Sequence, residues 1–314
     1  MNKTNISNQF DNILQGRIKG RSTQVDWILA MMTAILLVFG IMMVFSTTFD
    51  LAYNWYGSRF VMLTKHFWHL VVGLLSLVLC AILDYRKLRL PVVSLGVGIT
   101  TVVVLILVLF IGTDRGLVAG SYQPSELAKL VTILYFAVWM SSKQEKLTDF
   151  WYGMAPFAVL VGFIAGLIVL QPDISAAATV VIISVLMFFL AGAAIIHLGG
   201  ALIIASFVGY LVISFSSTGQ QRVSEYIAGL KDITEGSWHV RQAIVAFVDG
   251  GMFGVGLGKS AGKFSYLPVP HTDSIFAVVG EELGLMGSLL VVVFYVVLCW
   301  RGILISVRVD DPFG

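Results

Sequence analysis

Long apolar runs separated by short polar connections dominate the chain from residue 25 onward. A helix needs roughly 20 apolar residues to cross about 30 Å of hydrocarbon, and backbone groups in lipid must find partners within the protein. The pattern therefore predicts an all-α, polytopic transmembrane protein. The eight predicted spans are Val25–Phe45, Phe67–Leu83, Pro91–Ile111, Ser125–Met140, Phe157–Leu170, Ile174–Ala193, Gly200–Phe215 and Ser274–Trp300. The fourth and fifth are short, so we expect them to tilt, pack centrally or extend through flanking polar residues.

The predicted domain organisation is simple. Residues 1–24 form a polar, basic tail, and residues 25–314 form a single membrane domain. The tail lacks a short apolar core followed by a small-residue cleavage site, so a removable signal peptide is not expected. Residues 216–273 form one long segment between two predicted spans, and many of the charged residues gather there.

Orientation follows from the Lys and Arg residues of the short loops, because positive loops stay in the cytoplasm. With the tail inside, the inner loops hold Arg86, Lys87, Arg89, Lys143, Lys146, Arg301 and Arg308, and the short outer loops hold Arg59, Lys65 and Arg115. Both termini are then expected in the cytoplasm. The segment 216–273 is expected to be extracytoplasmic, and its length exempts it from the charge rule.

Composition excludes two classes of protein. The chain is 58% hydrophobic and 12% charged, whereas soluble domains carry about 25% charged residues. A net charge of +2 with no block of Lys and Arg argues against a nucleic-acid partner. Cys80 and Cys299 both fall inside apolar runs, so they are interpreted as small apolar residues and not as a disulfide or metal pair.

Several charged residues lie where the membrane penalises charge, by roughly 2.5 kcal/mol or more at the bilayer centre. They are Glu126, Lys129, Asp173, Glu281 and Glu282. Each must pair or face water. Glu126 and Lys129 are three residues apart on one helix face, so they are predicted to form an ion pair. That pair is either a structural clamp or part of a functional cavity.

Two short motifs place proline and carboxylate at helix starts on the same outer side. They are Gln123-Pro124-Ser125-Glu126 and Gln171-Pro172-Asp173. Proline at the first helical position costs no hydrogen bond, and a carboxylate there offsets the positive helix end. The motifs are therefore either helix caps or the lining of one outward-opening polar cavity.

The long outer segment is where chemistry is expected. Val240–Val248 is predicted to form a short amphipathic helix, and the glycine-dense run Gly250–Gly258 must turn tightly or approach another surface closely. Asp273 precedes the last apolar run, at the outer membrane boundary. It is either a helix cap or a partly buried general base, with His271 placed to tune it or to be a bystander. No cluster has the spacing of a metal site, and no glycine-rich loop has a phosphate-loop ending.

These motifs, in this order and spacing, resemble the SEDS family, which comprises FtsW, RodA and SpoVE. The residues that carry the resemblance are Gln123–Leu130, Gln171–Asp173, Gly250–Gly258, His271–Asp273 and Gly280–Gly284. The resemblance runs from the first helix to Gly314. Four linked motifs in order are far more specific than any one of them.

The resemblance implies a peptidoglycan glycosyltransferase of the bacterial inner (plasma) membrane that extends glycan strands from lipid II with a class B penicillin-binding protein. Asp273 matches the family's essential outer-loop aspartate. Its implied role is to take the proton from the acceptor sugar's 4-hydroxyl as that oxygen attacks the anomeric carbon bearing undecaprenyl pyrophosphate, with inversion. Glu126 and Lys129 match a family-typical pair expected to shape the cavity.

The leaving pyrophosphate requires cationic or metal stabilisation. The candidate substrate-binding residues are Arg115, Arg222, Arg241, Lys259, Lys263 and His271. Each cation is alternatively an ordinary solvated or headgroup-facing charge. A divalent cation, Mg²⁺ or Mn²⁺, is an open alternative, and no protein-built metal site is assigned.

The chain departs from the family pattern in three places. Arg115 alone remains of a basic-basic-Trp stretch, and Val269 and Ser274 replace a common Glu and a common Phe. The family has ten spans, so this chain, ending at Gly314, is expected to lack the last two. The outer segment and the long tail are closer to FtsW, the cell-division branch, than to RodA, which implies septal wall synthesis beside other division proteins.

Two other functions stay open. Acidic residues at membrane depth also suit a lipid II flippase, although the sequence lacks the repeated halves of alternating-access transporters. A non-catalytic scaffold of the division machinery is the second alternative.

Overall fold

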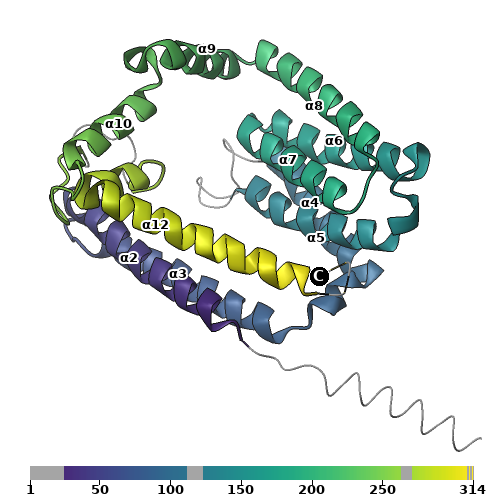
Figure 1. The fold of residues 1–314 in the computed structure, drawn as a ribbon, viewed down its shortest axis with the longest axis horizontal. Helices are drawn as coiled ribbons and strands as arrows, with labels where there is room; N and C mark the ends of the chain where they lie inside the picture. Colours follow the sequence, from purple (N-terminus) through teal and green to yellow (C-terminus); the bar gives the residue numbers. More distant parts are fainter. Residues whose placement is uncertain (1–24, 112–122, 263–270, 310, 312, 314) are drawn as a thin grey trace, which may run out of the picture. The chain divides into compact units, whose positions relative to one another are not determined.

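The computed structural model describes residues 25–111, 123–262, 271–309, 311 and 313. Within them the chain is all-α, with ten α-helices (Figure 1). It forms two compact units. Unit 1 comprises residues 1–66 and 243–306, and unit 2 comprises residues 67–242 and 307–314.

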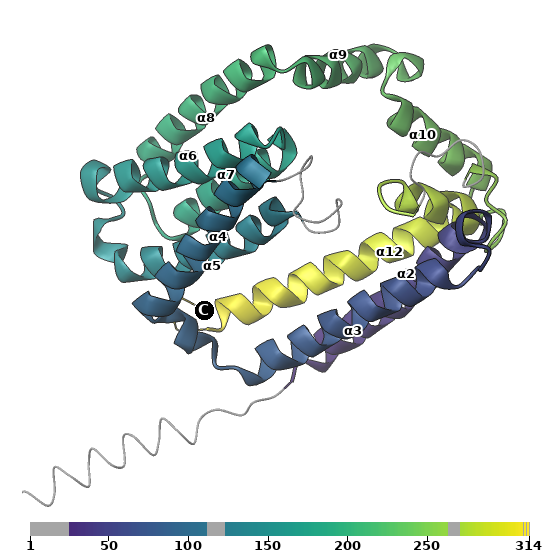
Figure 2. The same cartoon turned by 180° about the vertical axis from the view of Figure 1, so that it is seen from behind.

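Unit 1 is built on two long helices that lie side by side, α2 (Trp27–Tyr56) and α12 (Ile275–Val307), as Figures 1 and 2 both show. Apolar residues of α2, α12 and the end of α10 (Trp238–Gly250) form its core: Met43, Ala246, Ala277, Val278, Val279 and Val291. The first part of α3 (Val61–Ile82) also belongs to this unit.

Asp26 ties the start of α2 to the end of α12. Its carboxylate caps α2 by accepting from the Leu29 amide, and Arg301 donates two hydrogen bonds to it. The amide and then the guanidinium hold the pKa of Asp26 below its usual range. The contact brings residues near the two ends of unit 1 to the same end of the helix pair.

Unit 2 contains a bundle in which α4, α5, α6 and α7 pack together. Its elements are η1 (Tyr85–Arg89), α4 (Pro91–Ile111), α5 (Pro124–Ser142), η2 (Gln144–Lys146), the π-helix η3 (Phe150–Met154), α6 (Ala155–Leu170), α7 (Ile174–Leu190), α8 (Ile195–Phe215), α9 (Ser217–Lys231) and η4 (Ile233–Glu235). Phe136, Phe157 and Phe188 stack in one core, with ring centroids 5.3 and 4.3 Å apart along the series. The C-terminal residue Phe313 stacks on Tyr85, and Asp311 lies 3.7 Å from Arg89.

All eight predicted spans are helices, and the protein is a polytopic membrane protein. Among the described residues, six helices are long and apolar enough to cross a membrane. The short fifth span extends backward through η3 to make a 21-residue segment, Phe150–Leu170, as expected. The other two are α5, whose first turns are polar, and α7, which has 17 residues.

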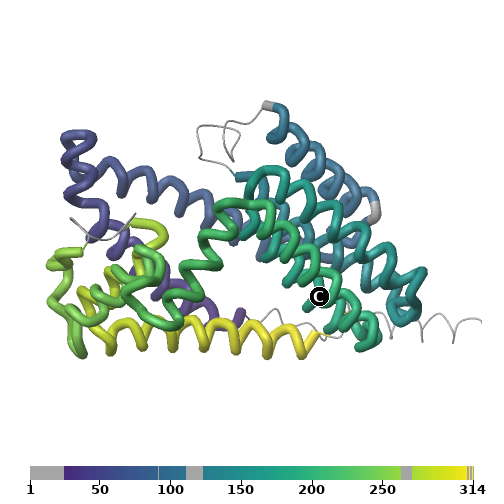
Figure 3. The backbone as a smooth tube through the Cα atoms, turned by 90° about the horizontal axis from the view of Figure 1, so that it is seen from above, coloured from purple at the N-terminus to yellow at the C-terminus, as the bar shows by residue number. Residues whose placement is uncertain are grey.

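The long segment after α8 is mostly helical. The predicted amphipathic helix Val240–Val248 is confirmed, because it lies within α10. The preceding helix α9 was not predicted from the sequence, because its mixture of Ser, Gln, Gly and charged residues gives a weak apolar signal. The tube in Figure 3 follows the chain from α8 through α9 into α10.

Candidate functional site

The glycine-dense run after α10 packs directly on the first turns of α12, within unit 1. Gly254 has φ +78, and a Cβ there would overlap the backbone of Glu282. Gly284, with φ +71, interrupts α12, and a Cβ at that position would overlap the backbone of Gly254 and Met252. Both expectations for this run, tight turning and close approach, are therefore confirmed.

The interruption at Gly284 frees backbone groups that a regular helix would pair internally. The carbonyl oxygens of Glu281 and Glu282 accept from the amides of Val255 and Gly256, at 2.9 and 3.0 Å. In return, the amides of Leu285 and Met286 donate to the carbonyls of Gly251 and Met252, at 2.9 and 3.2 Å. The broken helix thus satisfies its backbone groups through the glycine-rich turn, as membrane depth requires.

Two adjacent carboxylates next to this crossing are almost fully buried. Glu281, 2% exposed, accepts from the Ser260 hydroxyl at 2.5 Å, from the Ala261 amide at 2.6 Å and from the Gly262 amide at 3.2 Å. Glu282, 1% exposed, accepts from the hydroxyl of Ser46 on α2 at 2.7 Å. Both carboxylates therefore have polar partners, which the cost of buried charge demands.

Asp273 lies in the turn immediately before α12, and its side chain is exposed. The expected partial burial is therefore wrong. Among the described residues its carboxylate accepts no hydrogen bond and forms no ion pair, so it does not cap α12 there. The first turn of the helix instead begins with backbone bonds to Thr272 and Ser274. His271 is half-buried, and its Nδ1 has no partner within the described part of the chain.

In unit 2 the two proline-containing motifs meet. Asp173 caps α7 by accepting from the Ala176 amide at 3.2 Å. Its other oxygen accepts from the Gln123 side-chain amide at 2.5 Å and from the Ser125 hydroxyl at 2.9 Å. The Gln171 side chain donates to the Leu105 carbonyl on α4 at 2.9 Å. Capping and a joint polar cluster, the two alternatives for these motifs, are therefore both present at Asp173.

The flanking members of these motifs are placed as follows. Pro124 opens α5 and is buried, whereas Pro172 is exposed in the turn between α6 and α7. Glu126 and Lys129 form the predicted ion pair, with 2.7 Å between Lys129 Nζ and the nearer Glu126 oxygen. The Glu126 side chain is 62% exposed and Lys129 23%, so the pair is open to its surroundings.

The predicted cations have different environments. Arg222 on α9 is exposed and donates to the hydroxyl of Ser175, in the first turn of α7, at 3.3 Å. Arg241 is held locally by the Thr234 carbonyl at 2.9 Å and by the Trp238 ring. Lys259, on the glycine-rich turn, is exposed. Arg115 and Lys263 lie outside the described residues.

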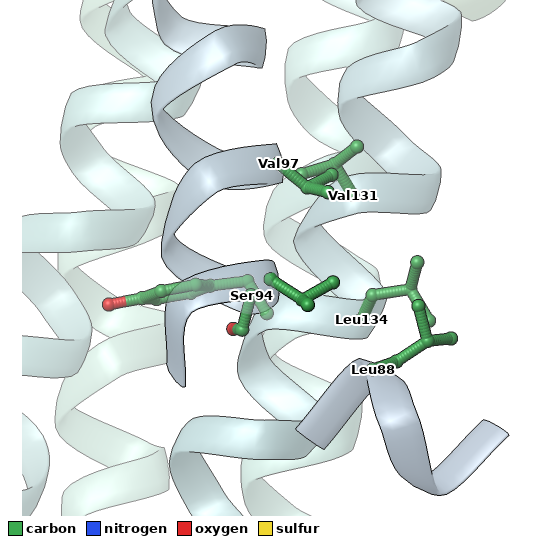
Figure 4. Close-up of a pocket in the computed structure, with 7 residues that line it drawn as sticks. Leu88, Ser94, Val97, Val131 and Leu134 are labelled. Carbon is green, nitrogen blue, oxygen red and sulfur yellow. The ribbon is translucent and has the colours of Figure 1, made fainter. Parts of the chain in front are cut away.

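Neither a metal site nor a pocket marks the site. In the described ranges no three His, Cys, Asp or Glu side chains converge to hold a metal ion, so no step below is routed through a cation. An apolar pocket of about 250 Å³ lies between η1, α4 and α5 (Figure 4). Its lining is Leu88, Val93, Ser94, Val97, Val131, Leu134 and Tyr135, which includes no predicted site residue.

Sequence reasoning missed two hydroxyls, Ser46 and Ser260, which are the partners of Glu282 and Glu281. A signal existed for the carboxylates, because charge inside an apolar run needs a partner. Nothing in the spacing could name the partners, since Ser46 is 236 residues from Glu282 in the sequence.

The chain is similar to known proteins over almost its whole length. The sequence profile of the FtsW/RodA/SpoVE family, described as cell cycle protein, matches residues 26–314. The probable peptidoglycan glycosyltransferase FtsW of Geobacter metallireducens is 30% identical over 299 residues, which cover 92% of this chain and 79% of that protein. Stage V sporulation protein E of Bacillus subtilis is 34% identical over 304 residues, covering 94% and 82%.

Proposed function

Since this chain belongs to the FtsW/RodA/SpoVE family of cell cycle proteins, we propose that it is a peptidoglycan glycosyltransferase that polymerises lipid II into glycan strands. The observation that carries the proposal is Asp273. Its carboxylate is exposed and unpaired among the described residues, directly before α12, while Glu281 and Glu282 nearby are buried and engaged. An unengaged carboxylate is free to accept a substrate proton.

In the proposed reaction Asp273 is the general base. The 4-hydroxyl oxygen of the acceptor sugar attacks the anomeric carbon of the donor, and its proton passes to the Asp273 carboxylate. The bond from that carbon to undecaprenyl pyrophosphate breaks, and the leaving group takes the electron pair, so the configuration inverts. Lys259 and Arg222, both exposed, are proposed to bind phosphate groups. His271 is proposed to contact substrate beside Asp273.

We further propose that the protein acts in septal wall synthesis with a class B penicillin-binding protein and other division proteins. The similarity to proteins named probable peptidoglycan glycosyltransferase FtsW supports this placement. Both termini are proposed to be cytoplasmic, with residues 216–273 outside. The contact of Asp26 with Arg301 supports one part of this topology, because it brings the predicted inner ends of α2 and α12 together.

The test is polymerisation of lipid II by the purified full chain in liposomes, with and without its penicillin-binding partner. Asp273→Asn keeps the shape of the side chain but removes the base, and we expect it to lower the rate by about 10²–10⁴-fold. Asp249→Asn is the matched control, since Asp249 is another exposed carboxylate of unit 1, and it should retain activity.

Other results would contradict the proposal in distinct ways. Equal polymer from wild type and Asp273→Asn would remove Asp273 from the mechanism. Faster transbilayer movement of lipid II without polymer would identify a flippase. Neither polymer nor movement, with the partner present, would leave a scaffold.

A further inference from the structure

The Glu281 carboxylate joins α12 to a distant part of the same unit. Three donors converge on it: the Ser260 hydroxyl and the amides of Ala261 and Gly262. With 2% of its surface exposed, Glu281 cannot touch a substrate. Its oxygens are already occupied by these donors, so any effect on a reaction must pass through what it holds.

What it holds is one end of the segment that leads to Asp273. Gly262 is fixed to Glu281, and Thr272 and Ser274 are fixed to the first turn of α12 by backbone bonds from Ile275 and Ala277. Glu281 and Asp273 are eight residues apart in the sequence. The chain between residues 262 and 272 is therefore a closed loop with both ends on the first turns of one helix, and closure removes chain entropy.

The helix that receives these bonds is itself held in place nearby. The backbone carbonyl of Glu281 accepts from Val255, and that of Glu282 accepts from Gly256. The side chain and the backbone of Glu281 thus bind two successive parts of the same segment, the glycine-rich turn and residues 260–262. Loss of the side-chain contact would release the second part and leave the first in place.

We propose that Glu281 is a positioning residue for Asp273: by fixing residues 260–262 to α12 it closes the loop that presents the Asp273 carboxylate. This inference rests on the proposed function. Charge is required, because two of the three donors are backbone amides that cannot reverse their direction. A glutamine at this position would point an amide group at donors, whereas the carboxylate accepts from all of them.

The test separates positioning from chemistry by two measurements on Glu281→Gln. The first is steady-state polymerisation of lipid II in liposomes. A misplaced base lowers kcat by on the order of 100-fold, since displacement of about 1 Å costs that much, whereas KM should stay within about twofold because uniform substrate binding is untouched. Ser260→Ala removes one donor and should lower kcat by about tenfold.

The second measurement reports position without any substrate. Spin labels at Thr272 and Val293, both exposed and both in unit 1, give a distance distribution in a background with Cys80→Ala and Cys299→Ala. We expect a narrow distribution in wild type and a broad one in Glu281→Gln. Ser288→Ala is the matched control on α12, since the Ser288 hydroxyl is buried and bonds to the Gly284 carbonyl of its own helix.

The outcomes are distinguishable. A distribution in Glu281→Gln as narrow as in Ser288→Ala would overturn the anchor, and an unchanged kcat would overturn its role in positioning. If Glu281→Gln does not fold, the milder Ser260→Ala carries both measurements with the same criteria. If wild type makes no polymer, the proposed function fails, while the spin-label distances still decide whether Glu281 anchors residues 260–262.

Discussion

At the scale of single residues, the carboxylates of this protein fall into two groups. Asp173, Glu281 and Glu282 are buried and accept hydrogen bonds from named donors. Asp273 and Glu126 are exposed. Burial without partners would cost several kcal/mol per charge, so the buried group must be structural or positioning. The exposed group is the one that substrates can reach.

Gly254 and Gly258 make a matched pair for testing the crossing. Both have φ +78, but a Cβ at Gly254 would overlap Glu282, whereas at Gly258 it would meet open space. Gly258→Ala should therefore cost only the left-handed strain, about 1–2 kcal/mol. Gly254→Ala should cost a further 1–3 kcal/mol or so from overpacking. Thermal unfolding of the detergent-solubilised variants measures the difference, and equal melting temperatures would contradict the crossing.

At the scale of elements, the polar contacts at helix starts do most of the specific joining. The start of α7 is joined to the start of α5 through Asp173, and α9 reaches the same turn through Arg222. Apolar packing alone discriminates poorly between helix arrangements in lipid, because lipid is as apolar as the side chains. The Gln-Pro-Asp and Gln-Pro-Ser-Glu motifs therefore specify how α5 and α7 meet.

Asp173 and Glu126 should differ strongly as sites of substitution. Asp173→Ala removes the cap of α7 and leaves Gln123 and Ser125 without their acceptor. We expect it to destabilise the protein by about 2–4 kcal/mol. Glu126→Gln breaks an exposed ion pair and should cost less than about 1 kcal/mol. Chemical unfolding followed by the helical circular-dichroism signal compares them. A larger loss for Glu126→Gln would show that the Asp173 cluster is not the joint between α5 and α7.

At the scale of the whole molecule, topology decides whether the proposed chemistry is possible. Lipid II polymerisation outside the cell requires Asp273 on the outer face. We expect Thr272→Cys, in the background without Cys80 and Cys299, to react with a membrane-impermeant maleimide in intact spheroplasts. Lys143→Cys, in a predicted inner loop and exposed, should react only after permeabilisation. Reaction of both in intact cells, or the reverse pattern, would refute the topology.

The positions of the helices could be read from the sequence because they depend on local patterns. All eight predicted spans are helices, and α4 has the predicted bounds, Pro91–Ile111. The ion pair of Glu126 with Lys129 was predictable for the same reason, since three-residue spacing on a helix is a local relation. By contrast, α9 was missed because its amphipathic pattern is weak and polar.

The sequence by itself determined the class of the protein, its spans and which residues carry a cost in the membrane, because hydropathy and helical spacing act between neighbours along the chain. Only the tertiary structure decided which partners remove that cost: Ser46 and Ser260 for the paired glutamates, and Gln123 with Ser125 for Asp173. It also decided that Asp273 is exposed and does not cap α12 among the described residues. Such contacts join residues 21 to 236 positions apart, and a distance set by packing leaves no trace in local spacing.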